Sequence, residues 1–283
     1  PIMVMRPHIL LLVADDLGWN DVSFHGSTQI PTPEIDALAK AGVIFDNYYV
    51  QPVCSPTRSS LLTGRHVIHS GIYDPDCGQG TTNAVPTAFT MLPAHLKQLG
   101  YDTHAVGKWH LGMFAPDVLP TGRGFDSFFG YYGGAEDYFT HTVGSFVDLH
   151  DDNGTIIAPA KGLQGKYSTH FYTKRAVSII EGFAKTRHGR TPEDGTDEKR
   201  SLFLYLAYQA IHSPDEVPDA YRDRFDSTIP DTKDGVGQHR RIVAGMVTAL
   251  DEGVGNVTRT LTATGMAEHT LIVFSTDNGG PAQ

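Results

Sequence analysis

Four short apolar runs stand out along the chain and predict strands. They cover residues 8–14, 102–107, 201–208 and 270–275. Three of them are continuously apolar and rich in Val, Ile, Leu or aromatic residues, which is typical of strands buried on both faces of a parallel sheet. Residues 102–107 show the weakest pattern of the four.

Helical patterns lie between these runs. Residues 33–41 have Thr32 as a predicted N-cap, Pro33 at the first helical position and Gly42 as a C-terminal stop. Residues 238–261 place seven apolar side chains on one helical face, namely Ile242, Met246, Ala249, Leu250, Val254, Val257 and Leu261. Strands that alternate with helices predict an α/β fold with helices on the faces of the sheet. We expect one domain over residues 1–283, with the charged stretch 185–200 as a surface loop.

Composition and charge narrow the function. A chain of 283 residues can bury a sizeable core. Its formal net charge of −10 argues against nucleic acid as a partner, because phosphate contacts need clustered Lys and Arg. Anionic substrates stay possible, since a local cationic pocket can lie inside an acidic protein. No apolar run approaches the roughly 20 residues that span a bilayer, so we expect no membrane span.

Polar and charged residues follow each predicted strand. In open α/β sheets, ligands bind beyond the carboxyl ends of the strands. An Asp after a strand is often only a helix cap, and a single His is usually a satisfied surface or core residue. Four such coincidences together predict a functional site formed by Asp15, Asp16, Lys108, His110, His212, Asp277 and Asn278.

The acidic members of this set indicate a metal. Asp15, Asp16, Asp277 and Asn278 supply only oxygen ligands, which suit Ca²⁺ or Mg²⁺, and the amide among the carboxylates favours Ca²⁺. Adjacent acids that point into one crevice are costly without a cation. A solvated turn would explain Asp15 and Asp16 alone, but not the second acidic cluster.

Cys54 precedes a third predicted helix. Ser55 reads as its N-cap, Pro56 as its first residue and Gly64 as its stop. Cys54 therefore lies just ahead of a helix N-terminus, where backbone N–H groups favour negative charge. With Arg58 one turn along, this environment is expected to stabilise a thiolate or another anion.

Two simpler interpretations of Cys54 remain. The chain has two cysteines, so one bridge between Cys54 and Cys77 is the most that is possible. A plain buried thiol is also ordinary, but it does not explain Pro56 and Arg58.

The segment "CSPTRSSLLTGR" resembles the sulfatase signature, in which a cysteine is followed by Pro and Arg two and four residues later. Thr57 stands where that signature usually has Ser. The segments "ADDLGWNDVSFHG", "VGKWHLG", "GFDSFFGYYGGAEDYFTH", "YLAYQAIHSP", "LDEGVGNVT" and "FSTDNGG" also resemble arylsulfatases, most closely the arylsulfatase B type (N-acetylgalactosamine-4-sulfatase). The likeness covers nearly the whole chain, in the family's order.

The resemblance implies a fold and a cofactor. The fold would be alkaline-phosphatase-like, with a mostly parallel or mixed central sheet, helices on both faces, and the family's C-terminal subdomain absent. Cys54 would be converted to Cα-formylglycine by a formylglycine-generating enzyme. The ligands of Ca²⁺, with Mg²⁺ less favoured, would be Asp15, Asp16, Asp277, Asn278 and the modified Cys54.

The resemblance also implies a reaction. The hydrated aldehyde at Cys54 would attack the sulfur of a sulfate ester, and its second hydroxyl would then expel sulfate. Arg58 and Lys108 would stabilise its charge, and His110 would assist deprotonation. His212 and Lys108 would contact the sulfate, with His212 as proton donor to the leaving oxygen. The substrate would be a sulfated small molecule or carbohydrate, including glycosaminoglycans.

Two other functions remain open. One is a phosphoester or phosphonate hydrolase of the same superfamily, and the other is a carbohydrate-binding relative that leaves Cys54 unmodified. The family resemblance suggests a lysosomal or secreted protein, and Asn153 and Asn256 begin N-glycosylation sequons. The family's downstream sulfate-binding lysine has no counterpart after Lys233, so we expect an incomplete site with feeble hydrolysis.

Overall fold

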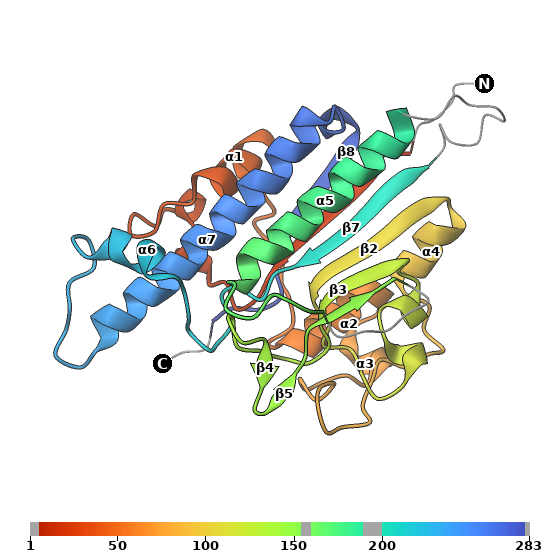
Figure 1. Ribbon diagram of the computed structural model, residues 1–283, viewed down its shortest axis with the longest axis horizontal. Coiled ribbons are helices and arrows are strands. Elements are labelled where there is room, and N and C mark those ends of the chain that lie inside the picture. The colour runs from red at the N-terminus through yellow and green to blue at the C-terminus, as the bar shows by residue number, and fades with distance from the viewer. Residues whose placement is uncertain (1–5, 154–159, 189–199, 281–283) are drawn as a thin grey trace.

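The computed structural model describes residues 6–153, 160–188 and 200–280. A six-stranded sheet in the order β6-β3-β2-β7-β1-β8 forms its centre (Figure 1). The strands are β1 His8–Ala14, β2 Tyr101–Lys108, β3 Ser127–Tyr131, β6 His150–Asp152, β7 Ser201–Ala207 and β8 Thr270–Thr276, and a separate hairpin pairs β4 Thr142–Val143 with β5 Phe146–Val147.

All four predicted strands are present, and each boundary moves by no more than one residue. Neighbouring strands are parallel except for β3 and β6, which pair in the antiparallel direction. The expected mixed, mostly parallel sheet is therefore confirmed. The strands β3 and β6 are absent from the sequence prediction because they are short and, in β6, polar.

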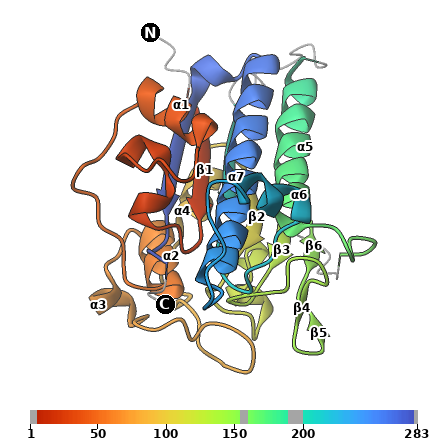
Figure 2. The same ribbon diagram turned by 90° about the vertical axis from the view of Figure 1, so that its left-hand side faces the viewer.

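Helices cover both faces of the sheet (Figures 1 and 2). The α-helices are α1 Pro33–Ala41, α2 Cys54–Thr63, α3 Val67–Ser70, α4 Leu92–Gln98, α5 Ser168–His188, α6 Asp219–Arg222 and α7 Val236–Ala263. Short 3₁₀ turns are η1 Trp19–Asp21, η2 Ser23–His25, η3 Pro116–Val118, η4 Thr121–Arg123, η6 Asp223–Phe225 and η7 Ala267–His269. No helix in the described part of the chain is both long enough and apolar enough to cross a bilayer.

The apolar side chains of β1 pack into two separate hydrophobic cores. Leu10 and Leu12 belong to the core that α5 and α7 cover, whereas Leu11 and Val13 belong to the core that contains Leu62 of α2. Side chains alternate between the faces of a strand, so a strand buried on both faces must be apolar at every position. This is why β1 shows no polar alternation.

The predicted helices α1 and α7 form with the expected boundaries at Pro33 and Gly42 and with the expected stripe on α7. Six of the seven predicted stripe residues are buried, and Ile242 is half-buried. The expected surface loop at 185–200 is wrong for its first part, because α5 continues to His188. Residues 189–199 lie outside the described residues, and the single domain over residues 1–283 stays a prediction.

A buried aspartate of α7 caps helix α1. Asp251 accepts hydrogen bonds from the backbone N–H of Glu34 at 3.1 Å and of Ile35 at 2.8 Å. The predicted cap residue Thr32 instead donates its hydroxyl to Asp36 at 3.0 Å. The first N–H groups of a helix have no partner within it, so Asp251 supplies one from a helix far away in sequence.

Replacing Asp251 should loosen α1. Asp251→Ala removes the acceptor of two N–H groups in the first turn of α1 and is expected to lower the free energy of unfolding by about 1–2 kcal/mol at pH 6. Asp251→Asn keeps one acceptor oxygen and should cost less. Urea unfolding measures both, with Glu181→Ala on the exposed side of α5 as control. Equal stability of the Ala variant and the control would contradict the capping role.

The same carboxyl group gives stability a pH dependence. Burial raises the pKa of Asp251 from 3.8 to about 6. The folded protein therefore holds this proton more tightly than the unfolded chain does, and the stability it contributes is lost as the pH rises through about 6. The stability advantage of the native chain over Asp251→Asn should shrink between pH 4 and pH 7, roughly the window between the two pKa values. An advantage that grows with pH would show the opposite linkage.

Candidate active site

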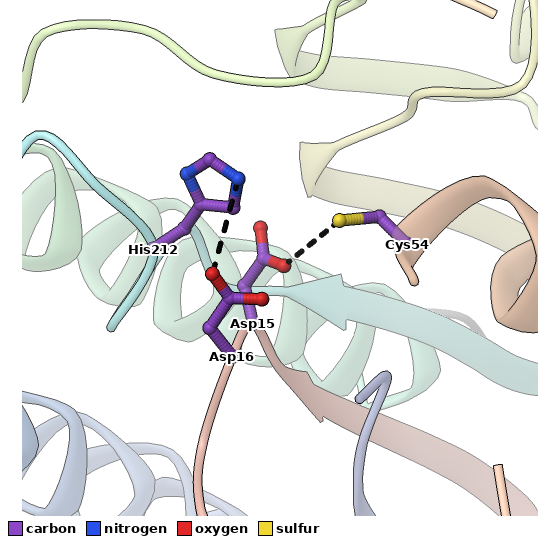
Figure 3. Close-up of side chains that lie close together, drawn as sticks. All are labelled: Asp15, Asp16, Cys54 and His212. Carbon is purple, nitrogen blue, oxygen red and sulfur yellow. Dashed lines mark hydrogen bonds and ion pairs between the residues drawn. The ribbon is translucent and has the colours of Figure 1, made fainter. Parts of the chain in front are cut away.

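The register of the sheet brings the predicted site residues together at its carboxyl edge. Ala14 of β1 pairs with Thr276 of β8, so Asp15 and Asp277 leave the sheet side by side. The segment after β7 is tied to the same point, because the Asp15 N–H donates to the Ala210 carbonyl at 2.9 Å. Figure 3 shows the result: Asp15, Asp16, Cys54 and His212 converge although they come from different elements.

Cys54 lies at the start of α2, not ahead of it. The N-cap is Val53 in an extended conformation, and Gly64 ends the helix in the left-handed region, as expected. The prediction that Ser55 is the N-cap is wrong, because its buried hydroxyl donates to the His110 carbonyl at 2.8 Å. Cys54 is 7% exposed, and its Sγ lies 3.6 Å from Asp15 Oδ1.

The expected thiolate at Cys54 is also wrong for this structure. Burial and the neighbouring Asp15 carboxylate raise the pKa of the thiol to about 12, although Lys108 opposes the shift. Among the described residues Cys54 and Cys77 are both free and buried, so the alternative of a bridge between them is not realised.

Two buried cations face the acids. Lys108 Nζ lies 2.6 Å from Asp15 Oδ2, and Arg58 contacts Asp277 Oδ2 at 2.8 Å and Asp15 Oδ2 at 3.6 Å. All four side chains are 0% exposed. Arg58 also donates to the hydroxyl of Tyr205 at 3.4 Å. This network joins α2 to the ends of β1, β2 and β8.

When the neighbouring Asp16 is counted with this network, three acids lie beside two cations. Burial and the charge of Asp15 raise the pKa of Asp277 to about 6. Burial also opposes ionisation of Asp15, but Lys108 and Arg58 hold its pKa below the usual value. Asp15, Asp16 and Asp277 together carry more formal charge than Arg58 and Lys108 can balance. A further cation at this place would relieve the excess.

The oxygen donors at this place fit a hard divalent cation. Ligand atoms of Asp15, Asp16, Cys54 and His212 all lie within 4.8 Å of one another. The Oδ1 atom of Asn278 is buried and has no hydrogen-bond partner among the described residues, while its Nδ2 donates to Asp16. An unpartnered amide oxygen beside carboxylates is the kind of ligand that Ca²⁺ takes.

Asp277 is placed differently from the other predicted ligands. Its Oδ2 holds Arg58, and its Oδ1 accepts the Asp16 backbone N–H at 3.3 Å. The ligand set Asp15, Asp16, Cys54, Asp277 and Asn278 stays a prediction. His212 joins the cluster instead, which the spacing of residues along the chain did not indicate.

His110 and His212 use opposite ring nitrogens to donate a hydrogen bond to a backbone carbonyl. His110 Nε2 donates to the Pro75 carbonyl at 3.1 Å, so the lone pair of the neutral ring is on Nδ1, which is buried without a partner in the described part of the chain. Burial and the charge of Lys108 hold the pKa of His110 well below its usual value, so the ring is neutral. His212 Nδ1 donates to the Ser213 carbonyl at 2.6 Å, which leaves Nε2 at 4.0 Å from Asp16 Oδ2 (Figure 3).

Sequence reasoning missed Tyr205. Its hydroxyl meets Arg58 inside the site, but its position within the apolar run 201–208 is that of an ordinary core aromatic. No local pattern distinguishes it from Phe203, which is buried in the same core.

Comparison with known proteins identifies the family of the chain. A family model described as "Sulfatase" matches residues 7–283. The chain belongs to the sulfatase family.

Sulfatases of several kinds resemble the chain. Arylsulfatase J of Mus musculus is 40% identical over 280 residues, which are 97% of this chain and 43% of that protein. Human N-acetylgalactosamine-6-sulfatase is 30% identical, with 96% of this chain and 50% of that protein covered. The crystal structure of Ps i-CgsB in complex with k-i-k-neocarrahexaose superposes with a TM-score of 0.82 at 33% identity, covering 98% of this chain and 59% of that one. The chain thus spans about half the length of these sulfatases.

The metal assignment predicts a response to Ca²⁺. Free Ca²⁺ at roughly 100 times its Kd should add about 2.7 kcal/mol of stability, or about 5–10 °C in Tm. Asp16→Asn should abolish that response while changing the metal-free Tm little. Among the described residues Asp16 pairs with no buried cation, and Asn also tolerates its left-handed φ of 59°. Differential scanning calorimetry with Ca²⁺, Mg²⁺ and chelator measures this.

The control for this experiment is Asp46→Asn, which changes an exposed acid. A Tm that responds to Ca²⁺ equally in the native chain and in Asp16→Asn would refute a site that contains Asp16.

Proposed function

We propose that this chain carries the catalytic site of a sulfuric ester hydrolase of the arylsulfatase type. One observation carries the proposal: Arg58 and Lys108, both fully buried, converge with Asp15 and Asp277 on Cys54. Membership of the sulfatase family supports it. Cleavage of a sulfate ester by water gives an alcohol and sulfate, so the site must stabilise an anion that gains charge.

Cys54 is proposed to be converted to formylglycine, with a formylglycine-generating enzyme as partner. That group supplies a hydrated aldehyde whose hydroxyl can attack sulfur. An unmodified Cys54 is a poor nucleophile at neutral pH, because burial and Asp15 raise its thiol pKa to about 12. The chemistry of this position therefore favours the modified residue.

The surrounding residues hold charge and move protons. Lys108 and Arg58 are the cations that face the reacting anion, and burial makes each of them worth more than it would be in water. The neutral His110 has a free Nδ1 lone pair, so it can accept a proton from the nucleophile. His212 can donate a proton from Nε2 only as an imidazolium, because Nδ1–H is held by Ser213.

Asp15, Asp16 and Asn278, with Asp277, are the proposed holders of Ca²⁺. Bound there, Ca²⁺ would supply positive charge next to the sulfate group. This fits the excess of carboxylates over cations and the unpartnered Asn278 amide oxygen.

Sulfated sugars are the proposed substrates. One relative is named for N-acetylgalactosamine 6-sulfate chemistry, and one solved structure holds a neocarrahexaose. We also propose that, among arylsulfatases, the chain most closely resembles the arylsulfatase B type. A phosphate monoester carries about −1.5 to −2 charges at pH 7, more than a sulfate monoester, so the excess acidity of the site favours the sulfate.

A lysosomal or secreted location is also proposed on the family resemblance. Asn256 of the second sequon is exposed on α7, where its side chain accepts from Arg259 at 2.8 Å. Asn153 of the first is exposed, but its Thr155 lies outside the described residues.

Modification of Cys54 is directly testable. In a host with the modifying enzyme, mass analysis of the peptide spanning Cys54 should show formylglycine, and the chain should release the phenol from an aryl sulfate. Cys54→Ala should abolish turnover without changing the fold. Cys77→Ser is the matched control and should retain turnover. A free thiol at Cys54 in a chain that still turns over would refute the mechanism.

Substrate preference separates the proposed reaction from its alternatives. We expect kcat/KM for an aryl sulfate to exceed that for the matched aryl phosphate and aryl phosphonate by at least about tenfold, a difference of about 1.4 kcal/mol. The reverse order would indicate a phosphoester or phosphonate hydrolase. Binding of sulfated oligosaccharide without hydrolysis, by a chain with unmodified Cys54, would indicate a carbohydrate-binding relative.

A further inference from the structure

Two loops hold His110. In the first, residues 75–79, the Pro75 carbonyl accepts a hydrogen bond from His110 Nε2 at 3.1 Å. In the second, residues 132–134, the Tyr132 carbonyl accepts the His110 backbone N–H at 3.0 Å. A β-carbon on Gly134 would lie 2.7 Å from the imidazole ring. The ring therefore keeps its place only while both loops keep theirs.

One carboxylate joins these two loops. Asp148 Oδ2 accepts from the Gly133 backbone N–H at 2.8 Å and from Gln79 Nε2 at 2.6 Å. Its Oδ1 accepts from the Tyr132 backbone N–H at 3.2 Å and lies 3.1 Å from His150 Nε2. Asp148 is 4% exposed, so these donors replace the water that a buried carboxylate loses.

The glycine at position 133 makes this junction possible. A β-carbon there would lie 2.1 Å from Gln79 Nε2, so a larger residue would block the path of the Gln79 amide to Asp148. Tyr132 then carries the connection onward, since its N–H binds Asp148 while its carbonyl binds the backbone of His110.

His110 needs such support because its backbone is strained. Its φ of 55° is in the left-handed region, which costs a residue other than glycine of order 1–3 kcal/mol and persists only when the surroundings fix it. The supports are the Ser55 hydroxyl on its carbonyl, Tyr132 on its N–H and Pro75 on its ring. Asp148 holds the loops that supply the last two.

We propose that Asp148 is a positioning residue for His110, acting through Gln79 on one side and through Tyr132 and Gly133 on the other. For its effect on turnover the inference rests on the proposed function, in which His110 accepts a proton. Its structural part stands alone: the carboxylate fixes the orientation of the His110 ring and the proton on Nε2. The partners of Asp148 are loop residues, so its loss should alter the proton transfer more than substrate binding.

Asp148→Asn tests this in the full chain. The amide places a donor where at least one N–H now binds, so one loop must shift. We expect kcat for an aryl sulfate to fall roughly tenfold or more with KM changed by less than about twofold. In NMR spectra of ¹⁵N-histidine-labelled protein, the His110 Nε2–H signal of the native chain should shift or disappear. Asp151→Asn, an exposed acid three residues along the chain, should leave both measurements unchanged.

Two further variants keep the test decisive. Gln79→Ala removes only one of the loop contacts at an exposed position, and Gly134→Ala pushes a methyl group against the ring. Both should move the His110 signal even if Asp148→Asn does not fold. An unchanged His110 signal in folded Asp148→Asn, or in Gln79→Ala where the former is unfolded, would overturn the proposal. If every chain lacks sulfatase activity while the signal moves as expected, the proposed function fails and the positioning inference stands.

Discussion

The active-site end of the molecule depends on the buried carboxylate of Asp15. It faces Lys108 at 2.6 Å, Arg58 at 3.6 Å and the Cys54 sulfur at 3.6 Å, and all of its oxygen atoms are shielded from water. Removing one member of a buried ion pair leaves an uncompensated charge and typically costs about 3–5 kcal/mol. The ends of β1 and β2 and the start of α2 are therefore fixed relative to one another by charge as well as by apolar packing.

The same ion pairs keep Lys108 and Arg58 at the place proposed to bind a sulfate anion. Lys108 and Arg58 are neutralised by Asp15 and Asp277, which reduces the repulsion between two desolvated positive charges. A divalent cation on the acids would weaken those pairs and leave the positive charge of both side chains available to a sulfate group. Asp277 therefore has a cation partner in Arg58 and does not point only at the proposed metal position.

The parts of the fold that sequence predicts are those decided by local physics. Continuous apolar runs identify β1, β7 and β8, and Pro33 and Gly42 bracket α1 correctly. Helix α5 is absent from the prediction although its buried residues Tyr172, Ala176 and Ile180 recur every four residues on one helical face, so the signal was present in the sequence. The Ser55 cap and the Cys54 thiolate are wrong because both depend on neighbours from distant elements, namely His110 and Asp15.

The site residues come from separate elements, and each element is positioned by a different core contact. Lys108 is the last residue of β2 and His110 follows it, next to Gly107, where a β-carbon would lie 1.8 Å from the Ala207 carbonyl oxygen. A substitution at this glycine would separate β2 from β7 and move Lys108 and His110 together, without touching either side chain. The relative positions of the site residues therefore depend on how closely the backbones of β2 and β7 approach each other. In the sequence, this close approach is indicated only by a glycine at the end of an apolar run. The position of the His110 imidazole depends in the same way on the two loops that Asp148 joins.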